Sequence, residues 1–196
     1  MTIFAKSNIV ILGDSLSAGF GIAQKKGWVT LLEQRIQQQH LPYHIINASI
    51  SGETTIGGRQ RLQHIIQQHQ PQILILELGG NDGLRGLSLN VIKDNLSAMI
   101  TLCLNHQVQV VLVGIRLPPN YGPIYTQRFS QIFSDIAKEN NVPLVPSILA
   151  GLEDDLEDFQ PDGIHPTTQA QPILLDNVWT VLSPLLQTQE VTLSLK

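Results

Sequence analysis

A serine follows a short apolar run near the start of the chain, in the sequence Gly13-Asp14-Ser15. The same three residue types are common in the first turn of a helix, where they serve only as caps. As a nucleophile, Ser15 would need a general base to take its proton and a third group to orient that base. The chemical interpretation of Ser15 therefore depends on what the rest of the chain supplies.

Two common motifs that contain such residues do not fit the spacing. Gly13, Gly19 and Gly21 do not form the G-x-G-x-x-G pattern of a dinucleotide site. Leu16 and Ser17 follow Ser15 where the G-x-S-x-G elbow of an α/β-hydrolase has its second glycine. A dinucleotide site and an ordinary α/β-hydrolase site both lose support.

One of the six histidines is a good candidate for the base. His165 lies in the loop sequence Asp162-Gly163-Ile164-His165, and positions i and i+3 of a tight turn before a helix can face each other. Asp162 could therefore orient the imidazole and stabilise its charged form. The other five fit helix ends, a polar helix face or the start of a strand: His40, His44, His64, His69 and His106.

An attacked carbonyl also needs hydrogen-bond donors where its oxygen becomes negative. Gly52 can bring its backbone N–H close to a ligand because it has no side chain, and Asn81, between glycines, can present its amide. The Ser15 N–H would be a third donor. Each residue alone is explained by turn chemistry, but their occurrence after three successive strands favours an oxyanion hole.

These residues need a fold that brings distant loops together. Short apolar runs rich in β-branched residues predict buried strands. Between these runs, apolar residues recur at the i, i+3, i+4 spacing of amphipathic helices. Strict alternation predicts a three-layer α/β/α sandwich with a five-stranded parallel sheet in flavodoxin-like order, as one domain over residues 1–196. The strands are expected at 9–12, 45–46, 73–76, 108–113 and 144–145, and a last helix at 168–186 with a possible bend at Pro172.

The combination of residues resembles the SGNH (GDSL) hydrolase superfamily. Its four name-giving positions match Ser15, Gly52, Asn81 and His165, and Asp162 matches the usual aspartate. The longer strings ILGDSLSAG, NASISGETT, LELGGNDGLRG, IRLPPNYG and DGIHP further resemble the bacterial acyl-CoA thioesterase I, lysophospholipase and arylesterase group.

The resemblance implies a serine hydrolase that cleaves esters and thioesters through an acyl-enzyme, without metal or cofactor. Its small-molecule substrates would be fatty acyl esters, acyl-CoA, lysophospholipids or aryl esters. Asp14 and Asp82 are expected to hold loop geometry. Apolar side chains could line an acyl groove: Leu84, Leu87 and Pro118 as candidate substrate-binding residues, with Ile148, Leu149, Leu152, Leu156 and Phe159 before the Asp-His turn.

Two other functions stay open. A carbohydrate O-acetylesterase of the same superfamily would keep the triad but prefer an acetyl group. A non-catalytic flavodoxin-like module would bind a phosphate ligand at the first loop. Comparing activity on the acetyl and decanoyl esters of one phenol distinguishes the O-acetylesterase from a hydrolase of fatty acyl esters. Failure to react with a fluorophosphonate favours the non-catalytic module.

The composition excludes several partners. Twelve basic and sixteen acidic residues give a formal charge of −4, with only 5% aromatics, so nucleic acid is not expected to bind. No apolar run approaches the roughly 20 residues of a membrane span. The acidic run at 153–158 lacks the pattern of a calcium loop and is expected to be solvated.

The start of the chain bears on its location. The sequence MTIFAKSNIVIL has no basic segment followed by an apolar core and a cleavage site. The resemblance implies a periplasmic or secreted enzyme made with a leader, whereas the chain as given would stay cytoplasmic if it is the full-length product. Cys103, the single cysteine, allows no intramolecular disulfide to indicate the compartment.

Overall fold

Five parallel strands form one sheet in the order β2-β1-β3-β4-β5. The computed structural model describes residues 6–23, 25–152 and 156–194. The predicted flavodoxin-like sheet is confirmed, because all five expected strands are present at the expected places. Their bounds are β1 Ser7–Gly13, β2 Tyr43–Asn47, β3 Pro71–Glu77, β4 Gln109–Val113 and β5 Leu144–Val145.

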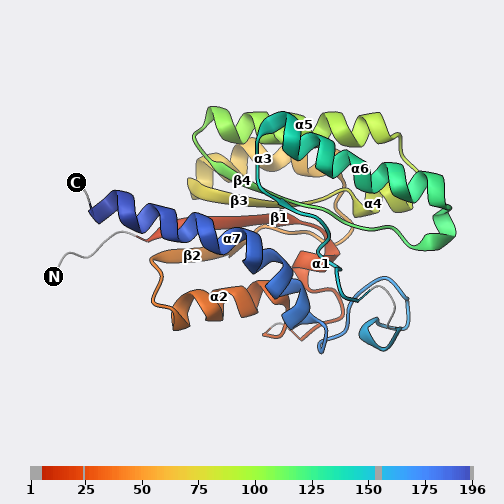
Figure 1. Ribbon diagram of the computed structural model, residues 1–196, viewed down its shortest axis with the longest axis horizontal. Helices are drawn as coiled ribbons and strands as arrows, with labels where there is room; N and C mark the ends of the chain where they lie inside the picture. The colour runs from red at the N-terminus through yellow and green to blue at the C-terminus, as the bar shows by residue number, and fades with distance from the viewer. Residues whose placement is uncertain (1–5, 24, 153–155, 195–196) are drawn as a thin grey trace.

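Helices cover both faces of the sheet, which makes the predicted three layers (Figure 1). One face carries α2 (Trp28–Gln38) and α7 (Gln171–Ser194), and the other carries α3 (Thr55–His69), α5 (Leu89–Asn105) and α6 (Pro123–Asn140). Four shorter helical segments lie in the loops: α1 (Ser15–Ala18), α4 (Gly80–Leu84), and the 3-10 turns η1 (Pro119–Tyr121) and η2 (Leu156–Asp158).

The inner strand β1 shows why the sheet is buried on both sides. Ile9 and Ile11 pack with α2 and α7, whereas Val10 and Leu12 pack with α3 and α5. Successive side chains of a strand point to opposite faces, so a continuous apolar run fills two cores at once. All four side chains are 0% exposed.

The last helix differs from its prediction at both ends. It begins at Gln171 rather than at residue 168 and continues to Ser194. Pro172 is its second residue, where a missing N–H removes no helical hydrogen bond, so no early bend is required there. The buried residues Leu175, Val178 and Leu182 continue the apolar stripe against the sheet.

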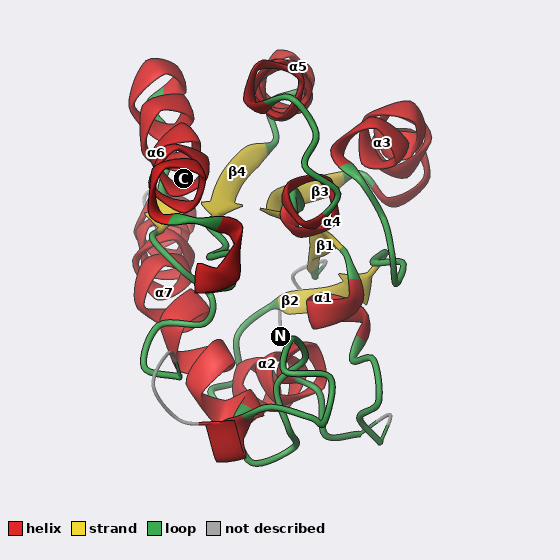
Figure 2. Ribbon diagram, turned by 90° about the vertical axis from the view of Figure 1, so that its right-hand side faces the viewer, coloured by secondary structure: helices red, strands yellow, loops and turns green. Residues whose placement is uncertain are grey.

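The carboxyl ends of the strands meet at one edge, on the right of Figure 1 and toward the viewer in Figure 2. There α1 follows β1 directly and α4 follows β3, and the strand order reverses between these two neighbours. Ligands of open parallel sheets bind in the crevice at this position. None of the described helices is long and apolar enough to cross a membrane. The single domain over 1–196 stays a prediction.

Candidate active site

The turn between β1 and α1 holds Ser15 at the edge of the sheet. Asp14 is the N-cap of α1, and its Oδ1 accepts the Leu16 N–H at 3.0 Å. A Cβ atom on Gly13 would lie 2.7 Å from both Glu77 Oε2 and Ser17 Oγ, so this position has room for glycine only. The sequence Gly-Asp-Ser therefore produces a tight turn that presents the serine hydroxyl.

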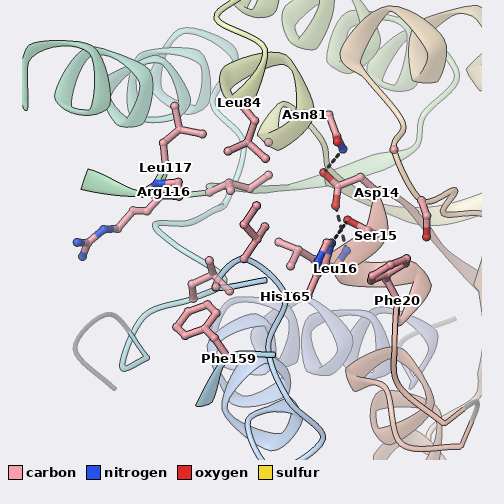
Figure 3. A pocket seen from close by; sticks show the side chains of 18 of the residues that line it. Asp14, Ser15, Leu16, Phe20, Asn81, Leu84, Arg116, Leu117, Phe159 and His165 are labelled. Carbon is pink, nitrogen blue, oxygen red and sulfur yellow. Dashed lines mark hydrogen bonds between the residues drawn. The ribbon is translucent and has the colours of Figure 1, made fainter. Parts of the chain in front are cut away.

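Three side chains from the two ends of the chain form a line of hydrogen bonds. His165 Nε2 lies 2.8 Å from Ser15 Oγ, and His165 Nδ1 lies 2.7 Å from Asp162 Oδ2. Figure 3 shows the imidazole pointing at the serine. This geometry is what the predicted roles of Ser15 as nucleophile, His165 as base and Asp162 as orienting carboxylate require.

The Asp162 carboxylate is held by its own turn as well as by the histidine. Its Oδ1 accepts the N–H groups of Ile164 at 2.9 Å and His165 at 3.0 Å. Partial burial acts in the opposite direction, but these bonds and the imidazole lower the pKa of Asp162 to about 2. Asp162 is therefore ionised at neutral pH and favours the tautomer with a proton on Nδ1.

The expected oxyanion donors line the same cleft as the serine. Gly52, with a φ of 81°, occupies the loop after β2, and Asn81 is the second residue of α4 after β3. The Asn81 side-chain nitrogen donates to Asp14 Oδ2 at 3.1 Å and to the Glu53 carbonyl at 3.0 Å. The fold thus brings together Ser15, Gly52 and Asn81 from three separate loops.

The cleft beside Ser15 has a volume of about 600 Å³ and a mainly apolar lining. In Figure 3, Leu84, Leu117 and Phe159 extend to one side of the serine and histidine. A cleft of this size accommodates an acyl chain or another small apolar group. Its main apolar residues are Leu16, Leu84, Ile115, Leu117, Pro118, Leu149, Phe159 and Ile164.

Only some of the predicted acyl-groove residues line the cleft. Leu84 and Pro118 line the cleft, together with Leu149 and Phe159. Leu87 does not line it, because the chain turns at Gly86 after α4 and leaves this side chain 39% exposed.

The remaining residues of that prediction lie away from the cleft or cannot be placed. Ile148 and Leu152 are fully buried in the core against α7 instead of facing the cleft. The side chain of Leu156 lies outside the described residues.

The sequence between Ile11 and Gln171 matches the family model of the "GDSL-like Lipase/Acylhydrolase family". This range contains every candidate residue of the site and most of the chain. The chain belongs to the GDSL-like lipase/acylhydrolase family. It is a serine ester hydrolase by family and by fold.

Named relatives of this GDSL hydrolase match it over nearly their whole length. "Esterase TesA" of Pseudomonas aeruginosa is 42% identical over 182 residues, which are 93% of this chain and 90% of that protein. "Thioesterase 1/protease 1/lysophospholipase L1" of Escherichia coli strain K12 is 39% identical over 181 residues, 92% of this chain and 86% of that protein. A crystal structure of TesA, 42% identical, superimposes with a TM-score of 0.89 and covers 91% and 99% of the two chains.

Beneath the turn Gly13-Asp14-Ser15 of the GDSL hydrolase, Asp14 lies beside a buried glutamate, Glu77, which sequence reasoning missed. Glu77 Oε2 accepts the Ser17 hydroxyl at 2.6 Å and the Asp14 N–H at 3.3 Å, and Glu77 is 0% exposed. Burial, and then the nearby Asp14, raise the pKa of Glu77 well above its ordinary value. Burial also raises the pKa of Asp14 to about 6. The signal was an acidic residue at the end of the apolar strand PQILILE.

A second missed residue touches the His165 ring directly. The ring of Phe20 lies with its centroid 4.6 Å from that of His165, and Phe20 is 51% exposed. This contact covers one side of the imidazole with an apolar surface. Phe20 follows α1, and no periodic pattern in the sequence marks it.

The described residues of the GDSL hydrolase offer no group of three or more His, Cys, Asp or Glu side chains that could hold a metal ion. Of the acidic run, residues 153–155 lie outside the described part of the chain, and Glu157 and Asp158 belong to η2. Among the described residues that line the cleft, His165 is the only histidine.

Proposed function

We propose that Ser15 is the nucleophile of this hydrolase, with His165 as its base and Asp162 as the orienting carboxylate. The observation that carries this proposal is the 2.8 Å hydrogen bond between His165 Nε2 and Ser15 Oγ, two residues that line the apolar cleft. The serine hydroxyl loses its proton to Nε2 as Oγ attacks the carbonyl carbon of an ester or thioester. The bond from Nδ1 to Asp162 stabilises the imidazolium that forms.

The negative oxygen of the tetrahedral intermediate needs donors that are already in place. The N–H groups of Ser15 and Gly52 and the side-chain amide of Asn81 serve as these donors. The Asn81 amide gives one N–H to this oxygen in place of its bond to Asp14. The imidazolium then protonates the leaving alcohol or thiol, and the acyl group remains on Ser15.

Deacylation repeats these steps with water. His165 Nε2 takes a proton from a water molecule as that water attacks the acyl carbonyl. The second tetrahedral intermediate collapses when the imidazolium returns a proton to Ser15 Oγ, which releases the carboxylic acid. Every proton in the two half-reactions passes through one nitrogen, so no metal or cofactor is required.

The substrates are fatty acyl esters and thioesters, with acyl-CoA, lysophospholipids and aryl esters as the compounds to test. The apolar side chains of Leu84, Leu117 and Phe159 extend the cleft well beyond the space that an acetyl group fills. The relative from Escherichia coli is named a thioesterase and a lysophospholipase, which supports this substrate class.

A hydrolysis screen with graded acyl chains tests the substrate class. We expect kcat/KM to rise from the acetyl to the decanoyl ester of one phenol, and turnover of acyl-CoA and lysophospholipids of similar chain length. A preference for acetyl would favour the carbohydrate O-acetylesterase alternative. Labelling by a fluorophosphonate in the wild type but not in Ser15→Ala identifies the nucleophile, and no labelling of the wild type would contradict the assignment of Ser15.

The periplasmic or secreted location is also a proposal, supported only by the family resemblance. Fractionation of cells that express the complete natural gene with a C-terminal tag tests it. Recovery of the tagged protein in the cytoplasmic fraction would contradict it.

A further inference from the structure

Two consecutive side chains near the start of helix α4 and one just after its end contact the segment from Gly52 to Thr55. Asn81 donates to the Glu53 carbonyl at 3.0 Å, and the Arg85 guanidinium, just after the helix, donates to the Gly52 carbonyl at 3.3 Å. Asp82 lies between these contacts and accepts two bonds from Thr55, from its N–H at 2.9 Å and its hydroxyl at 2.6 Å. The two loops that carry the oxyanion donors are therefore tied together by side chains.

The bonds between Asp82 and Thr55 are the buried part of this connection. Asp82 is 1% exposed and Thr55 is 0% exposed, whereas Arg85 lies at the surface. Thr55 is the first residue of α3, so its N–H has no partner inside that helix. The carboxylate of Asp82 thus satisfies a helix N-terminus and fixes the point where the Gly52 loop ends.

A line of hydrogen bonds behind Thr55 holds its hydroxyl in a single direction. Arg59 Nη1 donates to Asn95 Oδ1 at 3.0 Å, and Asn95 Nδ2 donates to Thr55 Oγ1 at 3.1 Å. The Thr55 hydroxyl in turn donates to Asp82. All donors in this line point toward the one carboxylate, and they come from α3 and α5 in the body of the protein.

We propose that Asp82 and Thr55 are positioning residues of the oxyanion hole, which set the place of the Gly52 N–H relative to the Asn81 amide. Neither residue lines the cleft, so neither contacts the substrate. They act through the loop 52–55 and through α4. This inference rests on the proposed roles of Ser15, Gly52 and Asn81 in the hydrolysis.

The chemistry explains why such a connection matters. Donors of an oxyanion hole must be held within about 0.5 Å of their productive positions, and a shift of about 1 Å can cost about 100-fold in rate. Gly52 has a positive φ and no side chain of its own to anchor it. Its position therefore depends on neighbouring side chains.

A matched pair of variants at Thr55 tests this role. Thr55→Val removes the hydroxyl and keeps the shape, whereas Thr55→Ser keeps the hydroxyl. With a short-chain aryl ester, we expect Thr55→Val to lower kcat by about 10- to 100-fold while KM changes by less than about threefold. Thr55→Ser should restore kcat to within about threefold of the wild type. An unchanged kcat in Thr55→Val, measured well below its unfolding temperature, would overturn the proposal.

A double variant separates positioning from a general loss of stability. In the Asn81→Ala background the placement of the Gly52 N–H relative to that amide no longer matters, so adding Thr55→Val should cost less in kcat than it does in the wild-type background. The same 10- to 100-fold loss in that background would mean that the two effects are independent, and it would overturn the proposal. If Thr55→Val does not fold, Asp82→Asn replaces it under the same criteria.

The proposed function fails by a different result. If Ser15→Ala keeps its turnover, the assignment of the nucleophile is wrong. If Ser15→Ala is inactive and Thr55→Val matches the wild type, only the positioning role of Asp82 and Thr55 is lost.

Discussion

The side-chain nitrogen of Asn81 lies 3.1 Å from Asp14 Oδ2 and 3.0 Å from the Glu53 carbonyl oxygen. Both N–H bonds of this amide therefore have acceptors without a substrate. A neutral ester carbonyl is a weaker acceptor than a carboxylate, but an oxygen that carries a full charge competes well. In the proposed oxyanion hole, this amide would therefore contribute to the chemical step more than to substrate binding.

Replacement of Asn81 by alanine should reduce kcat by about 10² to 10³-fold, because a donor to the developing oxyanion is lost. KM should change much less, since the ground-state carbonyl gains little from the amide. Steady-state kinetics with one aryl ester measures both constants. If kcat survives while KM rises sharply, Asn81 is a substrate-binding residue, and the oxyanion hole consists of Gly52 and Ser15.

Ser15→Ala and His165→Ala should each remove most of the turnover and leave the fold intact. Both remove a partner of the same proton transfer, so the double variant should be scarcely worse than either single variant. Circular dichroism and thermal unfolding check that the three proteins are folded. Losses that multiply in the double variant would contradict the shared role of these residues.

Asp162→Asn should lower kcat by up to about 10⁴-fold, because an amide at this place favours the wrong tautomer of His165. The surface pair of Arg35 and Asp176, 2.7 Å apart, offers a matched control, since Asp176 does not line the cleft. Asp176→Asn should therefore keep the wild-type kcat. An active Asp162→Asn would assign the orienting role to another group.

The buried carboxyl of Glu77 should make the folded protein less stable as the pH rises. In the unfolded chain a glutamate loses its proton near its ordinary pKa of 4.5, whereas burial raises the pKa of Glu77 well above that value. Between the two values the unfolded chain has released a proton that the folded protein keeps, so the free energy of unfolding falls with increasing pH. Asp14, with a pKa raised to about 6, contributes in the same direction.

Glu77→Gln tests this effect, because glutamine has nearly the same shape and no proton to release. Urea unfolding at pH 5 and pH 8 should show a smaller loss of stability in the variant than in the wild type. Part of the loss should remain, since Asp14 still titrates. Equal losses in both proteins would show that Glu77 titrates in the folded protein as it does in the unfolded chain.

Much of the scaffold follows from local patterns in the sequence. The run at 73–76 lies inside β3, and Leu62, Ile65 and Ile66 fall on the buried side of α3. These elements are predictable because burial on both faces of the sheet requires apolar side chains at fixed spacing. In α7, apolar residues at helical spacing are fewer after residue 186. The predicted end of this helix at residue 186 is therefore too early, since α7 continues to Ser194.

The part of the cleft that Ile115 and Leu117 line is not predictable from such local patterns. Ile115 and Leu117 follow β4 and extend its apolar run, so their sequence alone does not show that they turn toward Ser15. Their path depends on Gly114, which donates to the Val145 carbonyl at 2.8 Å and accepts the Ile148 N–H at 2.9 Å. Such a contact joins loops that are about thirty residues apart, and no local pattern records it.

Ser15 and His165, its proposed base, are 150 positions apart in the chain, and this separation has a consequence during synthesis. A ribosome adds about 5 to 20 residues per second, so Ser15 is made roughly 8 to 30 s before His165. In that interval the proposed nucleophile has no imidazole to take its proton. The proposed mechanism therefore implies that a nascent chain that ends before His165 does not hydrolyse esters.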